Sequence, residues 1–360
     1  MADGEMGPAR VWPVVVRFPD GPVEEVVEAD AVDAARQRTR LLVRGPLFGV
    51  AVQEEADGAR WRVVSAITAT SGQDARDSLN SLLWFRAKDE ARDRAERRAL
   101  LAAVARLETE RVDELTVLGS RYRVVRAEEY LGAGPGGMET ARPTDAGPLV
   151  PDWDLTVREP AVDDGLVLDT TAPVTPTQAA ERFAMRGHSY SGDRYPRDVR
   201  RDSARAVTDH PDVVLLPTTF RVLERHDGEW TVSGTLHSTA HGARRSLEFG
   251  LNWYEPRRQG IVEFDADRGV DARSLLAAGD HPDADYLAEL VHAADRLREH
   301  ADEVEVDGVA RRICRMRRLV RWGPDGPEPP RRSDTDSHPP EQIRPRLDED
   351  GVVHHATEDG

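Results

Sequence analysis

Cysteine, lysine and long apolar runs are almost absent from this 360-residue sequence. Cys314 is the single cysteine, so no disulfide can form within the chain. No stretch approaches the roughly 18 consecutive apolar residues of a membrane span, and the N-terminus lacks the basic start and apolar run of a signal peptide. These absences predict a soluble cytoplasmic protein with no membrane partner.

The charged residues are unevenly chosen. Lys88 is the only lysine, so 48 of the 49 basic residues are arginine, a pattern typical of GC-rich genomes. An arginine is therefore weaker evidence for anion recognition here than in most proteins. The net charge of −17 repels nucleic acid and anionic lipid, so we expect no nucleic-acid partner. No phosphate loop, CxxC, GxSxG or HExxH motif occurs, so we predict no cofactor.

An internal repeat is the strongest pattern in the chain. WRVVSAITATSGQDARDSL, which begins at Trp61, matches WTVSGTLHSTAHGARRSL, which begins at Trp230. Downstream, VDELTVLG from Val112 matches ADEVEVDG from Ala301, 189 residues further on. The repeat predicts two tandem units, residues 1–172 and 173–360. The offset grows between the two matches, which predicts an inserted segment near 255–283 in the second unit.

Each predicted unit is an antiparallel hairpin, then helices, then a second hairpin, which is the pattern of an α+β protein. Ser71 and Asp74 resemble a capping box at the start of a helix, and Pro256 is expected to end the matching helix of the second unit. We expect the units to pack about a pseudo-twofold axis, and each proline-rich tail to pack along its own unit. The other expected elements are helices near 28–38 and 176–186, second hairpins at 114–130 and 303–321, and short strands at 166–168 and 352–354.

Two stretches resemble a known family. RRALLAAVARLETERVDELTVLGSRYRVVRAEEY and RRLVRWGPDGPEPPRRSDTDSHPP are similar to uncharacterised proteins of GC-rich actinomycete bacteria, a family catalogued only as a domain of unknown function. The resemblance covers nearly the whole chain. It implies a bacterial cytoplasmic protein, and it supplies no activity, cofactor or catalytic residue.

Two segments contain candidate catalytic or metal-binding residues. His237 and His241 stand four residues apart, a spacing that on a helix can hold a metal; helix capping or surface exposure is the alternative. RGHSYSGDRYPRD, from Arg186, gathers His188, Asp193 and Tyr195, which could form a polar site with the histidine as acid or base. The same composition is also typical of a polar loop.

RRICRMRRLVRW, residues 311–322, is the third candidate. On a strand Cys314, Met316, Val320 and Trp322 fall on one face, which we expect to point inward, and Arg315, Arg317 and Arg321 fall on the other. The arginines could bind a partner, or they could pair with the protein's own carboxylates, such as those of Glu128 and Glu129 at the matching positions of the first unit. The candidate binding residues are Arg315, Arg317, Arg318 and Arg321.

The two predicted units share their pattern of elements but not the candidate catalytic or metal-binding residues. This favours a non-enzymatic scaffold whose two units present a shared surface to a protein partner. The alternative is an enzyme with an asymmetric polar site in the second unit, for which His188, Asp193 and Tyr195 would have to converge with His237 or His241.

Overall fold

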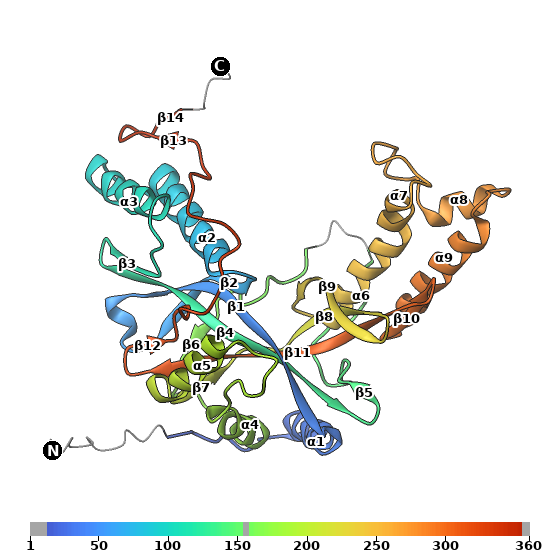
Figure 1. The fold of residues 1–360 in the computed structure, drawn as a ribbon, viewed down its shortest axis with the longest axis horizontal. Helices are drawn as coiled ribbons and strands as arrows, with labels where there is room; N and C mark the ends of the chain where they lie inside the picture. The colour runs from blue at the N-terminus through green and yellow to red at the C-terminus, as the bar shows by residue number, and fades with distance from the viewer. Residues whose placement is uncertain (1–12, 154–157, 355–360) are drawn as a thin grey trace.

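Two long strands, β4 (Ser120–Gly134) and β11 (Val309–Gly323), cross the centre of the molecule (Figure 1). The computed structural model describes residues 13–153 and 158–354. β4 and β11 run antiparallel and pair in the middle, where Glu129 lies opposite Arg318. All pairs of named strands in the described part of the chain are antiparallel, and helices lie outside the sheet, so the α+β prediction is confirmed.

One 12-stranded sheet extends on both sides of this pair, in the order β6-β2-β1-β4-β11-β8-β9. Three short strands also pair with β11 (β7, β10 and β12), and two with β4 (β3 and β5). Both central strands are buried along nearly their whole length, although they contain several arginines and glutamates. The bounds are β1 Arg40–Gln53, β2 Trp61–Ala69, β3 Glu114–Val117, β5 Gly137–Met138, β6 Val167–Leu168, β7 Asp212–Leu215, β8 Thr219–His226, β9 Glu229–His237, β10 Glu303–Val306 and β12 Gly326–Pro327.

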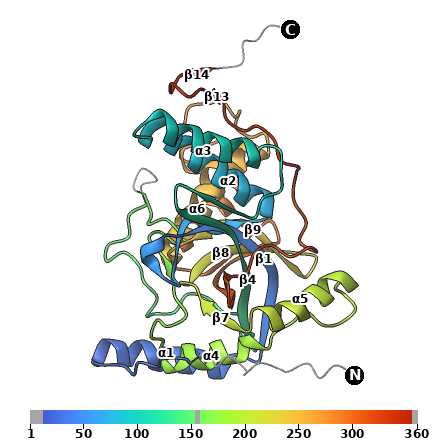
Figure 2. The ribbon, with the colours of Figure 1, turned by 90° about the vertical axis from the view of Figure 1, so that its left-hand side faces the viewer.

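The helices form three groups around the sheet. In Figures 1 and 2, α2 and α3 stand above one half, α6 to α9 stand above the other, and α1, α4 and α5 lie below. The bounds are α1 Pro22–Gln37, α2 Gly72–Phe85, α3 Arg94–Leu107, α4 Pro176–Arg186, α5 Arg197–Asp209, α6 Ala240–Phe249, α7 Glu255–Arg258, α8 Ala272–Ala278 and α9 Ala284–Arg298, with a 3-10 turn η1 at Glu55–Asp57 and π turns η2 at Arg86–Glu90 and η3 at Gly250–Tyr254. The capping box predicted at Ser71 and Asp74 is confirmed at the start of α2.

Each upper helical group encloses its own core. Leu79 and Leu83 of α2 are fully buried in a cluster that includes Phe48 of β1. In the second half, Leu247 of α6 and Phe220 of β8 belong to the corresponding cluster. A third cluster, with Trp61, lies between them and joins both halves. The apolar face predicted for each helix therefore packs on its hairpin, as amphipathic helices do.

The same order of elements occurs in both halves of the chain. β3, β4 and β5 each begin 189 residues before β10, β11 and β12. The single strand β1 corresponds to two strands, β7 and β8, separated at residues 216–218. The segment near 255–283 contains α7 and α8, and no helix lies between η2 and α3 in the first half.

One helix was not predicted. Residues 187–196 form the predicted polar loop, and α5, which follows from Arg197 and ends just before β7, occupies the place that α1 has before β1. The predicted helix at 176–186 is present as α4 and precedes this one. α5 is rich in arginine and aspartate and buries Asp202, Ser203 and Ala206, so its apolar stripe is too weak to identify from sequence.

The prediction that Pro256 ends a helix was wrong. α6 continues through η3 into α7, and the helical run ends at Arg258. Pro256 stands in the first turn of α7, directly after the π turn in which the amide of Glu255 donates to the carbonyl of Gly250. Pro256 has no amide hydrogen to donate within the helical run, and it is tolerated directly after the π turn, where the hydrogen bonds already depart from the α-helical pattern.

Over most of their length the proline-rich tails pack on the other half, and not along their own as predicted; the first tail returns to its own half where β6 pairs with β2. The amide of Arg126 donates to the carbonyl of Glu328 at 2.9 Å, and the amide of Arg315 donates to that of Glu139 at 2.8 Å. Beyond this exchange the C-terminal tail reaches α2, where the indole of Trp84 donates to the carbonyl of Pro345. The short strands also differ, because β6 joins the large sheet, whereas β14 (Val353–His354) pairs with β13 (Arg346–Leu347).

A buried ion pair fastens the two halves behind the central strands. Arg318 donates to both oxygens of Asp163 at 2.7 Å, and neither side chain is exposed. Arg318 also donates to the carbonyl of Ile67, whose amide donates to Asp163. The pair thus joins β11 to β2 and to the tail of the first half.

We expect Arg318→Met to lower the free energy of unfolding by about 3–5 kcal/mol, because it leaves the carboxylate of Asp163 buried without its cation. Denaturant unfolding of the whole chain measures this. Arg106→Met is the matched control, because its pair with Glu110 is more than half exposed and should contribute less than about 1 kcal/mol. Equal losses in the two variants would contradict the assigned role of Arg318.

Candidate functional site

The arginines of β11 are enclosed and paired with carboxylates. Arg315 binds Asp145 at 3.0 Å, and Arg317 binds Glu139 at 2.8 Å and Glu181 at 3.0 Å. Asp145 and Glu139 belong to the tail of the first half. The candidate binding residues therefore connect the two halves in this structure.

Arg321, the fourth of these arginines, reaches a different element. It donates to the backbone carbonyls of Arg186 and His188, just after α4. Its side chain is 2% exposed. An external partner would have to displace these contacts before it could bind Arg321.

Glu128 and Glu129 of β4 are also buried, with opposite shifts in pKa. Burial alone would raise the pKa of Glu128, but Arg126, Arg331 and the hydroxyl of Tyr190 outweigh it and hold the pKa at about 2. Burial raises the pKa of Glu129 despite its contact with Arg221. Glu128 is therefore a permanent anion at neutral pH, held by an ion-pair network.

A small hollow of about 140 Å³ lies beside the crossing of β4 and β11. Tyr130, Glu181 and Arg317 line it, and the hydroxyl of Tyr130 donates to Glu181 at 2.6 Å. Its charged walls already bind one another. Its lining comes from both halves of the chain.

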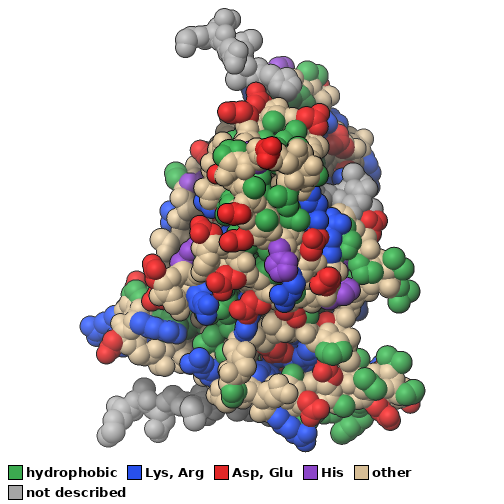
Figure 3. Space-filling view, turned by 90° about the vertical axis from the view of Figure 1, so that its right-hand side faces the viewer, with side chains coloured by type: hydrophobic (Ala, Val, Ile, Leu, Met, Phe, Trp, Pro, Cys, Tyr) green, Lys and Arg blue, Asp and Glu red, His purple; other side chains and the backbone are tan. Residues whose placement is uncertain are grey.

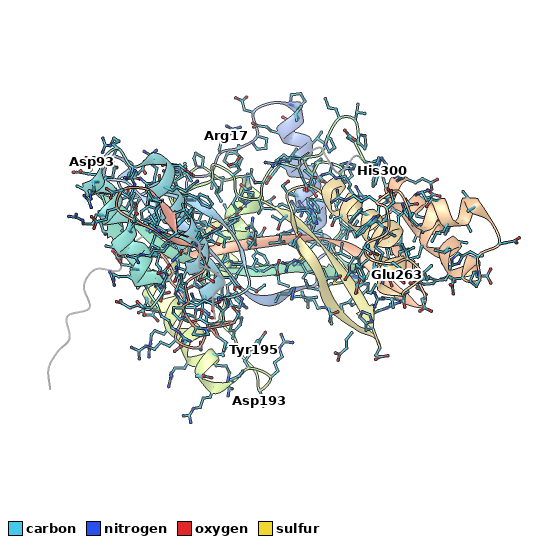
Figure 4. All side chains as sticks on the ribbon, turned by 90° about the horizontal axis from the view of Figure 1, so that it is seen from above. Arg17, Asp93, Asp193, Tyr195, Glu263 and His300 are labelled. Carbon is cyan, nitrogen blue, oxygen red and sulfur yellow. The ribbon has the colours of Figure 1, made fainter. Side chains whose placement is uncertain are left out.

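The loop between α4 and α5 holds the candidate catalytic residues. His188 packs edge-on against Tyr190, and burial lowers its pKa. Tyr195 stacks on the other side of Tyr190 with 4.7 Å between ring centroids. Asp193 is fully exposed, 3.6 Å from Arg200. Figure 4 shows Asp193 and Tyr195 at the periphery of the molecule.

The two histidines of the predicted metal pair have separate partners. His237 lies 3.2 Å from Glu159, and His241 lies 2.7 Å from the carbonyl of Asp152 and packs on Trp153. Glu159 also accepts from the amide and hydroxyl of Thr239 and so caps α6. Within residues 13–153 and 158–354, no three His, Cys, Asp or Glu side chains are grouped to hold a metal ion.

The candidate catalytic and metal-binding residues thus fall into two groups with separate neighbours. The contacts of His188 and Tyr195 centre on Tyr190, whereas those of His237 and His241 involve residues 152–159. Within residues 13–153 and 158–354, no hydrogen bond, ion pair or ring contact joins the two groups. The structure does not bring them together in one pocket.

Cys314 packs with Met316 and Val320 on the inward face of β11, as its position in the strand predicts. Burial raises the pKa of its thiol to about 12. The thiol is therefore protonated at neutral pH and packs as a small apolar side chain.

The sequence interpretation missed an apolar surface around α1. None of the residues of α1 is buried. Val23 is 76% exposed and Val26 60%, and Phe18 just before the helix is 72% exposed. Figure 3 shows hydrophobic side chains between acidic ones over this helix, at the lower right. We name the α1 surface by its residues Val15, Val16, Phe18, Val23, Val26 and Val27.

A groove of about 370 Å³ continues the α1 surface toward α4. Val23 and Val27 line one wall, and Pro173 and Val174 line the other. The signal in the sequence was the density of valines among acidic residues after Pro22, a proline in the first turn of the helix. A helix with exposed valines and no buried residue has the composition of an interaction surface.

The fold and these surfaces define an α+β protein built on one antiparallel sheet, with buried charge networks and an exposed apolar helix. Residues 21–337 match the model of a family of unknown function, DUF5954, and the chain belongs to that family. Neither the curated proteins nor the solved structures contain a match to it. None of the helices in the described residues has the length and apolar character needed to cross a bilayer.

The charge network around Glu128 gives an expected pH dependence. Its pKa of about 2 lies below the ordinary value of 4.5, so its ionised form stabilises the fold above pH 4.5, and this stability is lost as the pH falls toward 2. The contribution is about 3 kcal/mol. We expect Glu128→Gln to flatten the fall in unfolding free energy between pH 5 and 3, measured by denaturant titration at constant ionic strength.

Glu305→Gln serves as the control for this measurement, because Glu305 is exposed on β10. Its pH profile should follow that of the wild type. A Glu128→Gln profile with the wild-type slope would show that the carboxylate does not titrate as described.

Proposed function

We propose that the chain is a tandem of two related units, residues 1–172 and 173–360, and acts as a non-enzymatic scaffold for a protein partner. The composition and the family resemblance support a bacterial, actinomycete and cytoplasmic setting for it. The proposal has two parts, the pseudo-twofold arrangement of the units and the surface to which the partner binds.

The register of the central strands supports the pseudo-twofold axis. The pair of Glu129 and Arg318 lies on the axis, because the two residues occupy matching positions in the two units. The pair on one side of it, Arg317 with Tyr130, corresponds under the axis to the pair on the other side, Leu319 with Glu128. The hydrogen bonds that fasten the tails repeat in the same way. The aligned pairs of the ladder are Arg317↔Tyr130, Arg318↔Glu129, Leu319↔Glu128 and Val320↔Ala127.

Matching ion pairs give independent support for the repeat. Arg76 binds Asp113 at 2.6 Å in the first unit, and Arg244 binds Asp302 at 2.6 Å at the corresponding place in the second. These pairs fasten the start of α2 and of α6 to the strand that follows the helices. Duplication of one unit would place the same contact in both copies, as these two ion pairs do.

The α1 surface carries the proposal for a partner. An apolar helix with no buried residue gains free energy when a partner covers it, at roughly 25 cal/mol for each Å² of apolar area removed from water. Its valines stand among Glu24, Glu25 and Glu28. The partner that fits is therefore a helix or segment of another protein with apolar side chains flanked by basic ones.

A second copy of this chain fits less well, because it would bring the same acidic helix against itself. A partner can bind a side chain of the folded helix only where that side chain is exposed to solvent. Val23 and Val26 meet this condition in the structure as it stands.

Photo-crosslinking tests the proposal directly. Benzoylphenylalanine placed at Val26 of the whole chain, in its native cells, should give one discrete adduct with another protein. The same probe at Leu118, which is 46% exposed in the β3–β4 turn, should not give this adduct. Val23→Glu in the Val26 probe strain should reduce the adduct at least tenfold, because it places a charge in the apolar contact.

Three results would contradict the proposal. The Val26 probe could give no adduct, it could give the same adducts as the Leu118 probe, or Val23→Glu could leave the adduct unchanged. An adduct of two copies of this chain would replace the proposed partner by self-association, which sedimentation of the purified protein would confirm.

A further inference from the structure

The second half contains a hollow of about 540 Å³ between the β8–β9 hairpin and the helical run from α6 to α7. This volume lies within the range of sites for small ligands. Val222, Leu247, Leu251 and Val309 give it an apolar floor. The polar residues of its walls include Glu224, His226, His237, Tyr254, Glu255, Arg258 and Arg311.

The corresponding place in the first half is filled. Val52 of β1 pairs across the strands with Tyr122 of β4, and the tyrosine is 2% exposed. In the second half, Glu224 pairs with Arg311 in the same position. The first half thus has an apolar contact at this position, and the second half has an ion pair beside an open space. Packing of the core does not require a charged pair here.

A glycine keeps the space open. Gly250 stands where the sequence repeat places Leu82 of the first half. A Cβ atom added at Gly250 would meet nothing within 4 Å, and its backbone does not have a positive φ. A leucine at this position would therefore project into the hollow without a clash at its first carbon atom.

Arg311 is the second and independent sign of a ligand. It is 9% exposed, and its Nε donates to Glu224 at 3.0 Å. Its terminal nitrogens have no hydrogen-bond partner among the described residues, and Nη1 is enclosed. A guanidinium has five N–H donors, and buried donors without acceptors are costly. A bound anion would satisfy the terminal donors of Arg311.

The acidic side chains of the hollow already have partners. Burial would raise the pKa of Glu255, but hydrogen bonds from Arg258, Tyr286 and Gln259 hold it at about 2. Burial also acts to raise the pKa of Glu224, but Arg311 and His226 outweigh it, so the pKa is lowered. Both carboxylates are therefore ionised and paired, and the unused donors belong to Arg311.

We propose that this hollow binds a small carboxylate with an apolar body, such as an aryl or alkyl acid. The carboxylate binds the terminal nitrogens of Arg311 as a bidentate pair, and the apolar body packs on Val222, Leu247 and Leu251. The site lies away from the α1 surface and rests on different residues. It therefore stands or fails independently of the partner proposed above.

Titration calorimetry of the whole chain with phenylacetate tests the proposal. Phenylacetate should bind saturably with one site, and uncharged phenylacetamide should bind at least tenfold more weakly. Arg311→Lys keeps a positive charge beside Glu224 but loses the planar pair of donors, so it should weaken phenylacetate binding at least tenfold.

Gly250→Leu should abolish binding by filling the hollow, as Leu82 does in the first half. Gly250→Ala is the matched control, because it makes the same change in helix propensity and adds a single methyl group; it should retain binding. Thermal unfolding checks that both variants fold. The proposal fails if the wild type does not bind phenylacetate, if phenylacetamide binds as well, or if a folded Gly250→Leu variant binds like the wild type.

Discussion

The fold depends on the antiparallel contact between β4 and β11 and on the buried pair of Arg318 and Asp163 behind it. The contact spans few residues, so side chains and tails must hold the halves together around it. They do so through charges that would be costly to bury alone and are stable here because each has its partner. The tails also hold the halves together. β4 binds the segment that follows β11, and β11 binds the segment that follows β4.

This arrangement separates two kinds of charged residue. The arginines of β11 and the glutamates of β4 are enclosed and act within the protein. Arg311, on the same strand, is 9% exposed and donates only from Nε, to Glu224, and it borders the hollow between the β8–β9 hairpin and α6. Both terminal nitrogens of Arg317, Arg318 and Arg321 are bound within the protein. Those of Arg311 have no partner among the described residues, and this difference marks it as the residue that we propose binds a ligand.

The apolar side chains divide in a similar way. Those of α2 and α6 are covered by their own hairpins and form the cores. The valines at the start of α1, Val23, Val26 and Val27, stay largely exposed. A protein of strongly negative charge can leave such a surface exposed and remain dispersed, because like-charged molecules repel each other. A basic partner would be attracted to the same surface.

The sequence determined the local structure: hairpins around Trp61 and Trp230, the capped helix after Ser71, the repeated order of elements and the alternating faces of β11. These follow from periodicity and turn residues within a short window. Only the tertiary structure decided where each tail goes, that Arg318 meets Asp163, that Pro256 sits after a π turn, and that Gly250 opens a hollow. The paths of the tails, the pair of Arg318 and Asp163 and the hollow depend on contacts between residues distant in the chain, which no local pattern encodes; the π turn depends on how α6 packs in that surrounding structure.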